Sequence, residues 1–154
     1  MTKINLRTDV PYRKFVQQRR LREAALKTLA HEAFPGRAEL TLVITGDDQI
    51  CALNRQYRGV DRPTDVLAFG DDQVEAAADK PFYLGDVIIS YPRAHAQAQA
   101  AGHSTADELA LLVIHGVLHL LGHDHAGRNE KRKMWAVQDD VLREMNTRIT
   151  ITDT

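Results

Sequence analysis

The strongest constraint on the fold is a cluster of histidines between residues 115 and 125. Four of the seven histidines in the chain lie within these eleven residues. His115 and His119 are four residues apart, which on a helix places them on one face, about 40° apart around the axis and one turn apart along it. Gly122 follows, and glycine readily adopts the left-handed conformation that ends a helix. The sequence therefore predicts a helix that stops at Gly122, after which residues 123–125 return toward its side.

This spacing is typical of a metal site. His115, His119, Gly122 and His125 match the fixed positions of the zinc-protease motif H-E-x-x-H-x-x-G-x-x-H. Three neutral imidazoles suit Zn²⁺ and leave a fourth position for water, whose pKa zinc lowers to about 7. We therefore expect one zinc ion per chain, held by His115, His119 and His125, and hydrolytic chemistry. Three imidazoles also bind Ni²⁺, Cu²⁺ or Fe²⁺, so the identity of the metal stays open.

Two residues inside the cluster keep alternative roles. His123 is a substrate contact, an alternative metal ligand or an ordinary surface residue. Asp124 is an acceptor for an imidazole N–H or a group that transfers a proton. Both are therefore candidate substrate-binding residues.

Position 116 separates this motif from that of a peptidase. In H-E-x-x-H enzymes the residue after the first histidine is the glutamate that acts as general base. Here that residue is Gly116, which has no side chain. A peptidase built on this sequence would need a base from elsewhere in the chain.

At this point the sequence resembles the YbeY family of metal-dependent endoribonucleases, also described as ribosomal-RNA maturation factors. Residues 115–125 match the family pattern H-G-x-L-H-L-x-G-[YH]-D-H at every fixed position, and two further segments agree, N-R-Q-Y-R through D-R-P-T-D-V-L-A-F at residues 54–69 and L-G-D-V-I-I-S at residues 84–90. The resemblance runs from about residue 40 to 140. One departure is Ala68, where the family often has serine.

The resemblance implies both an activity and site residues. Zinc would be bound by His115, His119 and His125, and Arg58 would be the functional basic residue. The implied work is single-strand RNA cleavage, 16S rRNA 3′-end maturation and ribosome quality control. The implied partners are rRNA and the 30S ribosomal particle, with no membrane.

Phosphate chemistry gives an independent reason to single out Arg58. Phosphodiester cleavage develops charge on non-bridging oxygens, and a planar guanidinium can hold two of them in a water-poor cleft. Arg58 precedes Gly59 at the expected end of a helix, a place from which a side chain can enter a cleft. Arg55 and Arg62 flank it and could follow a phosphate backbone, or they are solvated charges.

Composition narrows the class of protein. The formal charge of −1 and pI near 6.6 argue against coating nucleic acid by bulk electrostatics. Local basic segments exist, with six Lys or Arg and one Glu over residues 13–27, and four against one over residues 128–133. The single cysteine cannot form an intramolecular disulfide, which suits a reducing compartment. No apolar run approaches the ~20 residues that span a bilayer. We expect a cytoplasmic protein.

Hydrophobic periodicity predicts the arrangement of the chain. Strands are expected at residues 4–7, 39–45, 64–69 and 84–90. Helices are expected at residues 14–33 (with Phe15 on the apolar face), 47–58, 91–101, 106–121 and 128–144, with a mobile loop at 70–80 and a frayed tail at 148–154. These elements indicate a single α/β (α+β) domain over residues 1–154. Its small mixed sheet of about four strands packs with about five helices, and the metal site lies at the end of a central helix.

The leading functional hypothesis is a zinc-dependent endoribonuclease in which metal-bound water attacks an RNA phosphodiester and Arg58 stabilises the developing charge. One alternative is a zinc metallopeptidase with a displaced general base. The other is a ribosome-assembly module that binds RNA without catalysis, the metal ordering residues 115–125. The oligomeric state stays open.

Overall fold

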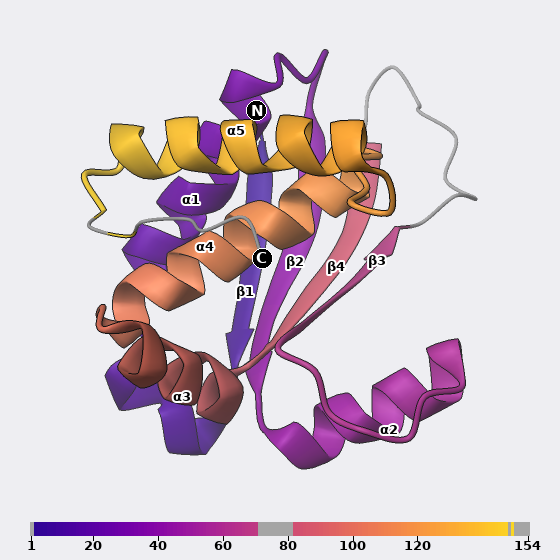
Figure 1. Ribbon diagram of the computed structural model, residues 1–154, viewed down its shortest axis with the longest axis vertical. Helices are drawn as coiled ribbons and strands as arrows, with labels where there is room; N and C mark the ends of the chain where they lie inside the picture. The colour runs from indigo at the N-terminus through magenta and orange to yellow at the C-terminus, as the bar shows by residue number, and fades with distance from the viewer. Residues whose placement is uncertain (1, 71–81, 148, 150–154) are drawn as a thin grey trace.

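Four strands form one mixed sheet in the computed structural model, which describes residues 2–70, 82–147 and 149. The strands are β1 (Lys3–Thr8), β2 (Ala38–Thr45), β3 (Val66–Gly70) and β4 (Phe82–Ser90). Their spatial order is β1-β2-β4-β3, with β1, β2 and β4 parallel and β3 antiparallel to β4. Strand β3 therefore lies at one edge of the sheet, although it is third along the chain (Figure 1).

Helices connect these strands and cover the sheet. They are the 3-10 helix η1 (Val10–Phe15) and the α-helices α1 (Gln18–His31), α2 (Asp47–Arg58), α3 (Tyr91–Ala101), α4 (Thr105–Leu120) and α5 (Arg128–Glu144). The predicted fold class, a small mixed sheet packed with helices, is confirmed.

The first helix begins later than the sequence predicted. Residues Val10–Phe15 form η1, with proline in its first turn, and α1 starts only at Gln18. Val16 between them is extended, with φ −109° and ψ 125°. Phe15, expected on the apolar face, is 55% exposed, and its ring stacks on Tyr91. Pro11 favours the start of the short helix, because its φ is fixed near −65° and the first turn needs no N–H donor. The extended backbone of Val16 and Gln17 then separates η1 from α1.

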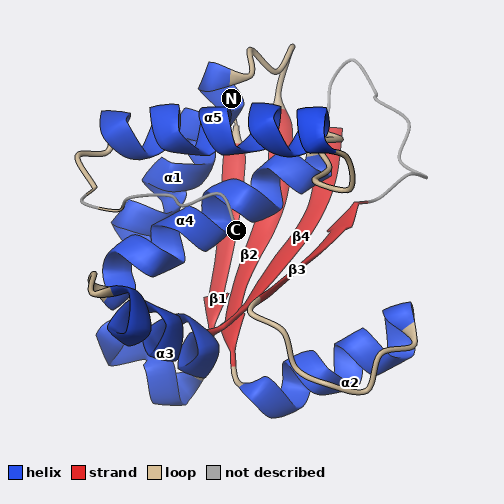
Figure 2. Cartoon of the chain, viewed as in Figure 1, coloured by secondary structure: helices blue, strands red, loops and turns tan. Residues whose placement is uncertain are grey.

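Side chains alternate between the two faces of the sheet. On β2, Leu42 and Ile44 join the larger core, which also holds buried residues of α1 and α4. Val43 between them joins a smaller cluster with Ile50 of α2 and Leu67 of β3. Helices therefore pack on both faces, and Figure 2 shows α1, α4 and α5 grouped together with α2 apart from them.

Helix α4 is the central helix, in contact with α1, α3, α5 and two strands. Leu109, Val113 and Leu118 are among its fully buried side chains. Where α4 crosses β4, a Cβ atom at Gly116 would lie 2.5 Å from Cγ1 of Val87 and 3.0 Å from its Cγ2. Glycine at this position therefore lets the helix backbone approach the sheet closely.

Two of the predicted segments lie mostly outside the residues that the structure describes. Gly70 ends β3, and the rest of the loop expected at residues 70–80 lies outside the described residues, as does the tail expected at 148–154 apart from Ile149. Within the described residues, no helix combines the length and apolar character needed to cross a bilayer.

The contact at Gly116 predicts the effect of a single methyl group. Alanine is favoured over glycine in a helix by up to about 1 kcal/mol, but an overpacked core loses about 1–3 kcal/mol. We expect Gly116→Ala to lower the free energy of unfolding by about 1 kcal/mol, measured by urea denaturation. In a Val87→Ala background, which removes the methyl groups that the added Cβ would overlap, the same change should be neutral or stabilising. A gain of stability with Val87 in place would contradict the close packing of α4 against Val87.

Candidate metal centre

Three imidazoles converge at the C-terminal end of α4. His115 and His119 lie one turn apart on the helix, and one ligand atom from each of them and from His125 falls within 4.8 Å of the others. Gly122 has φ +98°, and the His123 N–H donates to the carbonyl of Leu118 at 2.9 Å, which closes the helix end and reverses the chain. The turn predicted from the sequence is confirmed.

The spacing of the imidazoles fits one zinc ion. The Nε2 atoms of His115 and His119 face each other at 3.1 Å. Two nitrogen ligands at tetrahedral positions, each about 2.0–2.1 Å from zinc, are roughly 3.3 Å apart. Both rings could therefore bind one ion almost from the positions that they already occupy.

Burial keeps two of these imidazoles neutral. Desolvation is the main reason that the pKa of His115 lies below its ordinary value, although the hydrogen bond with Gln138 opposes the shift. Desolvation, reinforced by the neighbouring His115 and His125, lowers the pKa of His119 to about 4. At neutral pH both rings are in the unprotonated form that binds a metal.

A buried glutamine orients the imidazole of His115. Gln138 of α5 is only 2% exposed, and its Oε1 accepts a hydrogen bond from Nδ1 of His115 at 2.6 Å. This bond fixes the proton on Nδ1 and leaves Nε2 free to face His119. Trp135, one turn before Gln138 on α5, packs edge-on against both His115 and His125, with ring centroids 5.8 and 6.0 Å away. Helix α5 thus supports the back of the site.

The turn that carries His125 is tied to α1. Nε2 of His123 is hydrogen-bonded to Oε1 of Glu32, the residue that follows α1. The other Glu32 oxygen is 3.2 Å from Nδ1 of His31, and Nε2 of His31 is 3.3 Å from a carboxylate oxygen of Asp140 on α5. These contacts connect α1, the turn and α5 behind the imidazoles.

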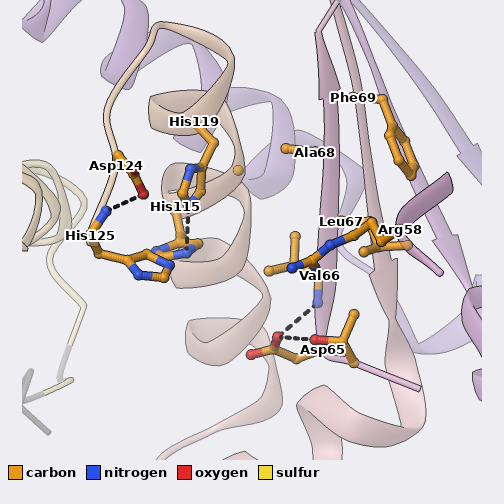
Figure 3. A pocket seen from close by; sticks show the side chains of 12 residues that line it. Arg58, Asp65, Val66, Leu67, Ala68, Phe69, His115, His119, Asp124 and His125 are labelled. Carbon is orange, nitrogen blue, oxygen red and sulfur yellow. Dashed lines mark hydrogen bonds between the residues drawn. The ribbon is translucent and has the colours of Figure 1, made fainter. Parts of the chain in front are cut away.

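In front of the imidazoles, a pocket of about 500 Å³ contains Arg58. Arg58 is the last residue of α2, which Gly59 ends with φ +70°. Figure 3 shows its side chain reaching past Val66 of β3 toward the imidazoles. Asp65 and Asp124 also line the pocket, so it combines a cation, two carboxylates and a candidate metal centre.

The two carboxylates are held by local backbone bonds. Asp65 accepts from the N–H of Val66 at 2.8 Å and from the hydroxyl of Thr64 at 3.3 Å. Asp124 accepts from the N–H of His125 at 2.7 Å. Each carboxylate is therefore fixed at the rim of the pocket by the segment that carries it.

Three further predicted substrate contacts lie elsewhere. Arg55, Arg62 and His123 are not among the described residues that line this pocket. Arg55 is exposed and pairs with Asp61 at 3.6 Å. Arg62 is also exposed, and its carbonyl accepts a hydrogen bond from the side-chain amide of Asn54 at 2.9 Å. The structure thus brings Arg58 and Asp124 to the three imidazoles and leaves the other three candidates outside.

Comparison with known proteins identifies the family. The family model described as Endoribonuclease YbeY matches residues 4–146. The chain belongs to the endoribonuclease YbeY family. It is 45% identical over 133 residues to a protein named endoribonuclease YbeY from Halalkalibacterium halodurans, covering 78% of this chain and 84% of that protein. It is 49% identical over 124 residues to a protein of the same name from Chloroflexus aurantiacus, covering 77% and 80%.

A solved structure shares the fold. The solution structure of a Thermotoga maritima protein superposes with a TM-score of 0.60 at 26% identity, covering 93% of this chain and 91% of that one. The YbeY-family match includes every residue of the pocket and every residue that supports it from behind.

Sequence reasoning missed three residues that shape this site. Gln138 could have been suspected, because it is a polar residue on the stripe that buries Met134 and Val141 of α5. Asp65 lies in a segment that resembles the family, but nothing in its local sequence pointed to the site. Glu32 carried no pattern, and only the packing of distant segments brings both residues there.

The hydrogen bond that His115 donates to Gln138 should strengthen metal binding. We expect Gln138→Leu to weaken zinc binding about 10- to 100-fold, as removal of a group that orients a ligand typically does, measured by competition with a chromogenic chelator. Gln138→Glu keeps an acceptor and should retain the affinity, and Met134→Leu controls for repacking of the same face of α5. Equal affinities of Gln138→Leu and the unaltered protein would contradict this role.

The lowered pKa of His119 predicts how the metal-stripped protein responds to acid. The unfolded chain takes up a proton near pH 6.5, whereas the folded protein does so only near pH 4. This histidine therefore costs stability progressively as pH falls through that window. With a chelator present, the free energy of unfolding of His119→Gln should fall less steeply between pH 7 and 4.5 than that of the unaltered protein. Parallel declines would count against a neutral buried His119.

Proposed function

We propose that this protein is a zinc-dependent endoribonuclease that cleaves single-stranded RNA. The observation that carries the proposal is the placement of Arg58 and the imidazoles of His115, His119 and His125 around one pocket. The names of its relatives support the same reaction class. A zinc ion held by the three imidazoles would supply a Lewis acid and a water of lowered pKa.

Arg58 would bind the phosphate that is cleaved. Its exposed guanidinium offers a planar fork of N–H donors to two non-bridging oxygens. Asp65 and Asp124 provide carboxylate acceptors at the pocket wall, within reach of water or a ribose hydroxyl. His115 and His119 are only partly exposed, whereas His125 is exposed. Charge interactions with a phosphate beside the first two imidazoles are therefore screened less than at an open surface.

The environment of Gly116 disfavours the peptidase alternative. In the zinc-protease motif the general base occupies this position, but here the helix backbone is packed against Val87 of β4. A glutamate side chain has no room there unless Val87 moves. Among the described pocket residues, the carboxylates come instead from Asp65 and Asp124, on other segments.

The finer role follows from family membership. We propose that the substrate is rRNA in the 30S particle, that the reaction belongs to 16S 3′-end maturation and ribosome quality control, and that the protein acts in the cytoplasm. The exposed Arg19 and the partly exposed Arg22 and Lys27 on α1, away from the pocket, fit a partner rich in phosphate.

Substitution of Arg58 tests this function. Zinc-loaded protein should cut single-stranded RNA, and chelation should abolish the cutting. Arg58→Ala should lower kcat/KM about 10²- to 10³-fold, the usual effect of removing a donor to developing negative charge. The zinc content should not change, because Arg58 is not a ligand. Arg55→Ala, which removes a nearby exposed arginine outside the pocket, is the matched control.

The alternatives give different outcomes. Cleavage of an unstructured protein such as casein, but not of RNA, would indicate a peptidase. Zinc-dependent binding of RNA without cleavage would indicate a non-catalytic module. Either result would overturn the proposal.

A further inference from the structure

Strand β3 separates the two halves of the pocket. Arg58 reaches it from the end of α2, whose Ile50 packs with Leu67 on one face of the sheet. His115 and His119 lie on α4, which packs on the other face, and His125 lies in the turn that follows α4. Figure 3 shows β3 between them, with Val66 and Asp65 facing the imidazoles. The outer edge of β3 is therefore a path along which an extended chain could contact both Arg58 and the candidate metal centre.

The pairing with β4 determines which backbone groups of β3 point outward. In antiparallel pairs, every second residue exchanges hydrogen bonds with its partner. The N–H of Ser90 donates to the carbonyl of Asp65 at 2.9 Å. The register pairs Leu67 with Ile88 and Ala68 with Val87, so Leu67 is bonded to β4 and Ala68 is not. The N–H and C=O groups of Val66 and Ala68 therefore point away from β4.

One of these outward donors already has a partner. The N–H of Val66 donates to the carboxylate of Asp65 at 2.8 Å. Because Asp65 lines the pocket, this bond shows that the outer edge of β3 faces the pocket. Within residues 2–70, 82–147 and 149, no acceptor meets the N–H of Ala68, and no strand pairs with the outer edge of β3. Ala68 lines the pocket, and its small side chain leaves its backbone accessible.

We propose that an extended single strand of RNA lies along the outer edge of β3 and accepts a hydrogen bond from the Ala68 N–H. The strand would thereby be aligned with its phosphate between Arg58 and the imidazoles. This inference rests on the proposed nuclease function and adds to it a binding mode and a positioning residue. The outward carbonyls of Val66 and Ala68 would accept from ribose hydroxyls or base amino groups.

The geometry favours an extended strand over a duplex. A hydrogen bond to a strand edge needs a heavy-atom distance of about 2.7–3.2 Å, so the bound chain must enter the pocket and follow the protein backbone. In a duplex the partner strand and the helical winding keep the phosphate backbone from following the protein backbone at this distance. The positive charge of Arg58 at the same wall favours a polyanion over a peptide.

Proline at position 68 removes the donor with little expected effect on the sheet. Proline is tolerated at an edge where the N–H faces outward, because no ladder bond is lost. We expect Ala68→Pro to lower kcat/KM for a short oligouridylate about 10- to 100-fold, the value of a hydrogen bond to a charged group, mostly through KM. Ala68→Val keeps the N–H and is the matched control.

A small substrate distinguishes the loss of RNA positioning from damage to the candidate metal centre. Bis(p-nitrophenyl) phosphate is a diester without a nucleotide chain that could run along β3, so Ala68→Pro should lower its hydrolysis much less than it lowers the cleavage of oligouridylate. Equal losses on both substrates, or no loss on oligouridylate, would overturn the proposal. Failure of the unaltered protein to cut any RNA would instead contradict the nuclease function itself.

Amide spectra give a second measurement that does not depend on a proline variant. In zinc-loaded Arg58→Ala protein, which cuts slowly, oligouridylate should shift the ¹⁵N–¹H resonance of Ala68 more than that of Leu67, whose N–H is bonded to β4. An unmoved Ala68 resonance at saturating oligouridylate would contradict the binding mode. Equal displacement of the oligouridylate by an extended peptide would contradict the preference for RNA.

Discussion

The site depends on how closely α4 approaches the sheet. At Gly116 the helix backbone lies so near Val87 of β4 that even one methyl group would overlap it. His115, next to this contact, and His119, one turn later, are thereby held beside β3 at the pocket wall. Protein interiors are close-packed, so a helix lifted by one side chain would move both imidazoles together. The glycine therefore determines where the candidate metal centre lies relative to Arg58.

Residues of α5 and at the end of α1 support the candidate metal centre on the side opposite the pocket. Gln138 and Trp135 of α5 fix the orientation of His115, and Glu32 at the end of α1 holds the turn that carries His125. These supports belong to helices packed in the main core, where movement is costly. Ligands held in place before the metal binds lose little conformational freedom when it does.

The pocket also includes a strand edge, a feature that many proteins cover. Unpaired backbone groups at a sheet edge invite association with other chains. In the part of the chain that the structure describes, β3 has five residues, and its edge is flanked by Arg58 and by the helix that carries His115 and His119. An edge in this position can serve as a binding surface for one extended chain without offering a long template for aggregation.

The sequence by itself determined the features that local rules govern. Helical periodicity and the glycine turn were enough to bring His115, His119 and His125 together, and the alternation of apolar residues identified the strands and the fold class. Only the tertiary structure decided that Gln138, 23 residues from His115, is its hydrogen-bond partner, and that Glu32 meets His123 across 91 residues. It also decided that the third strand lies at the edge of the sheet, between the arginine and the imidazoles. No local pattern encodes such contacts, because they depend on how whole helices and strands pack against one another.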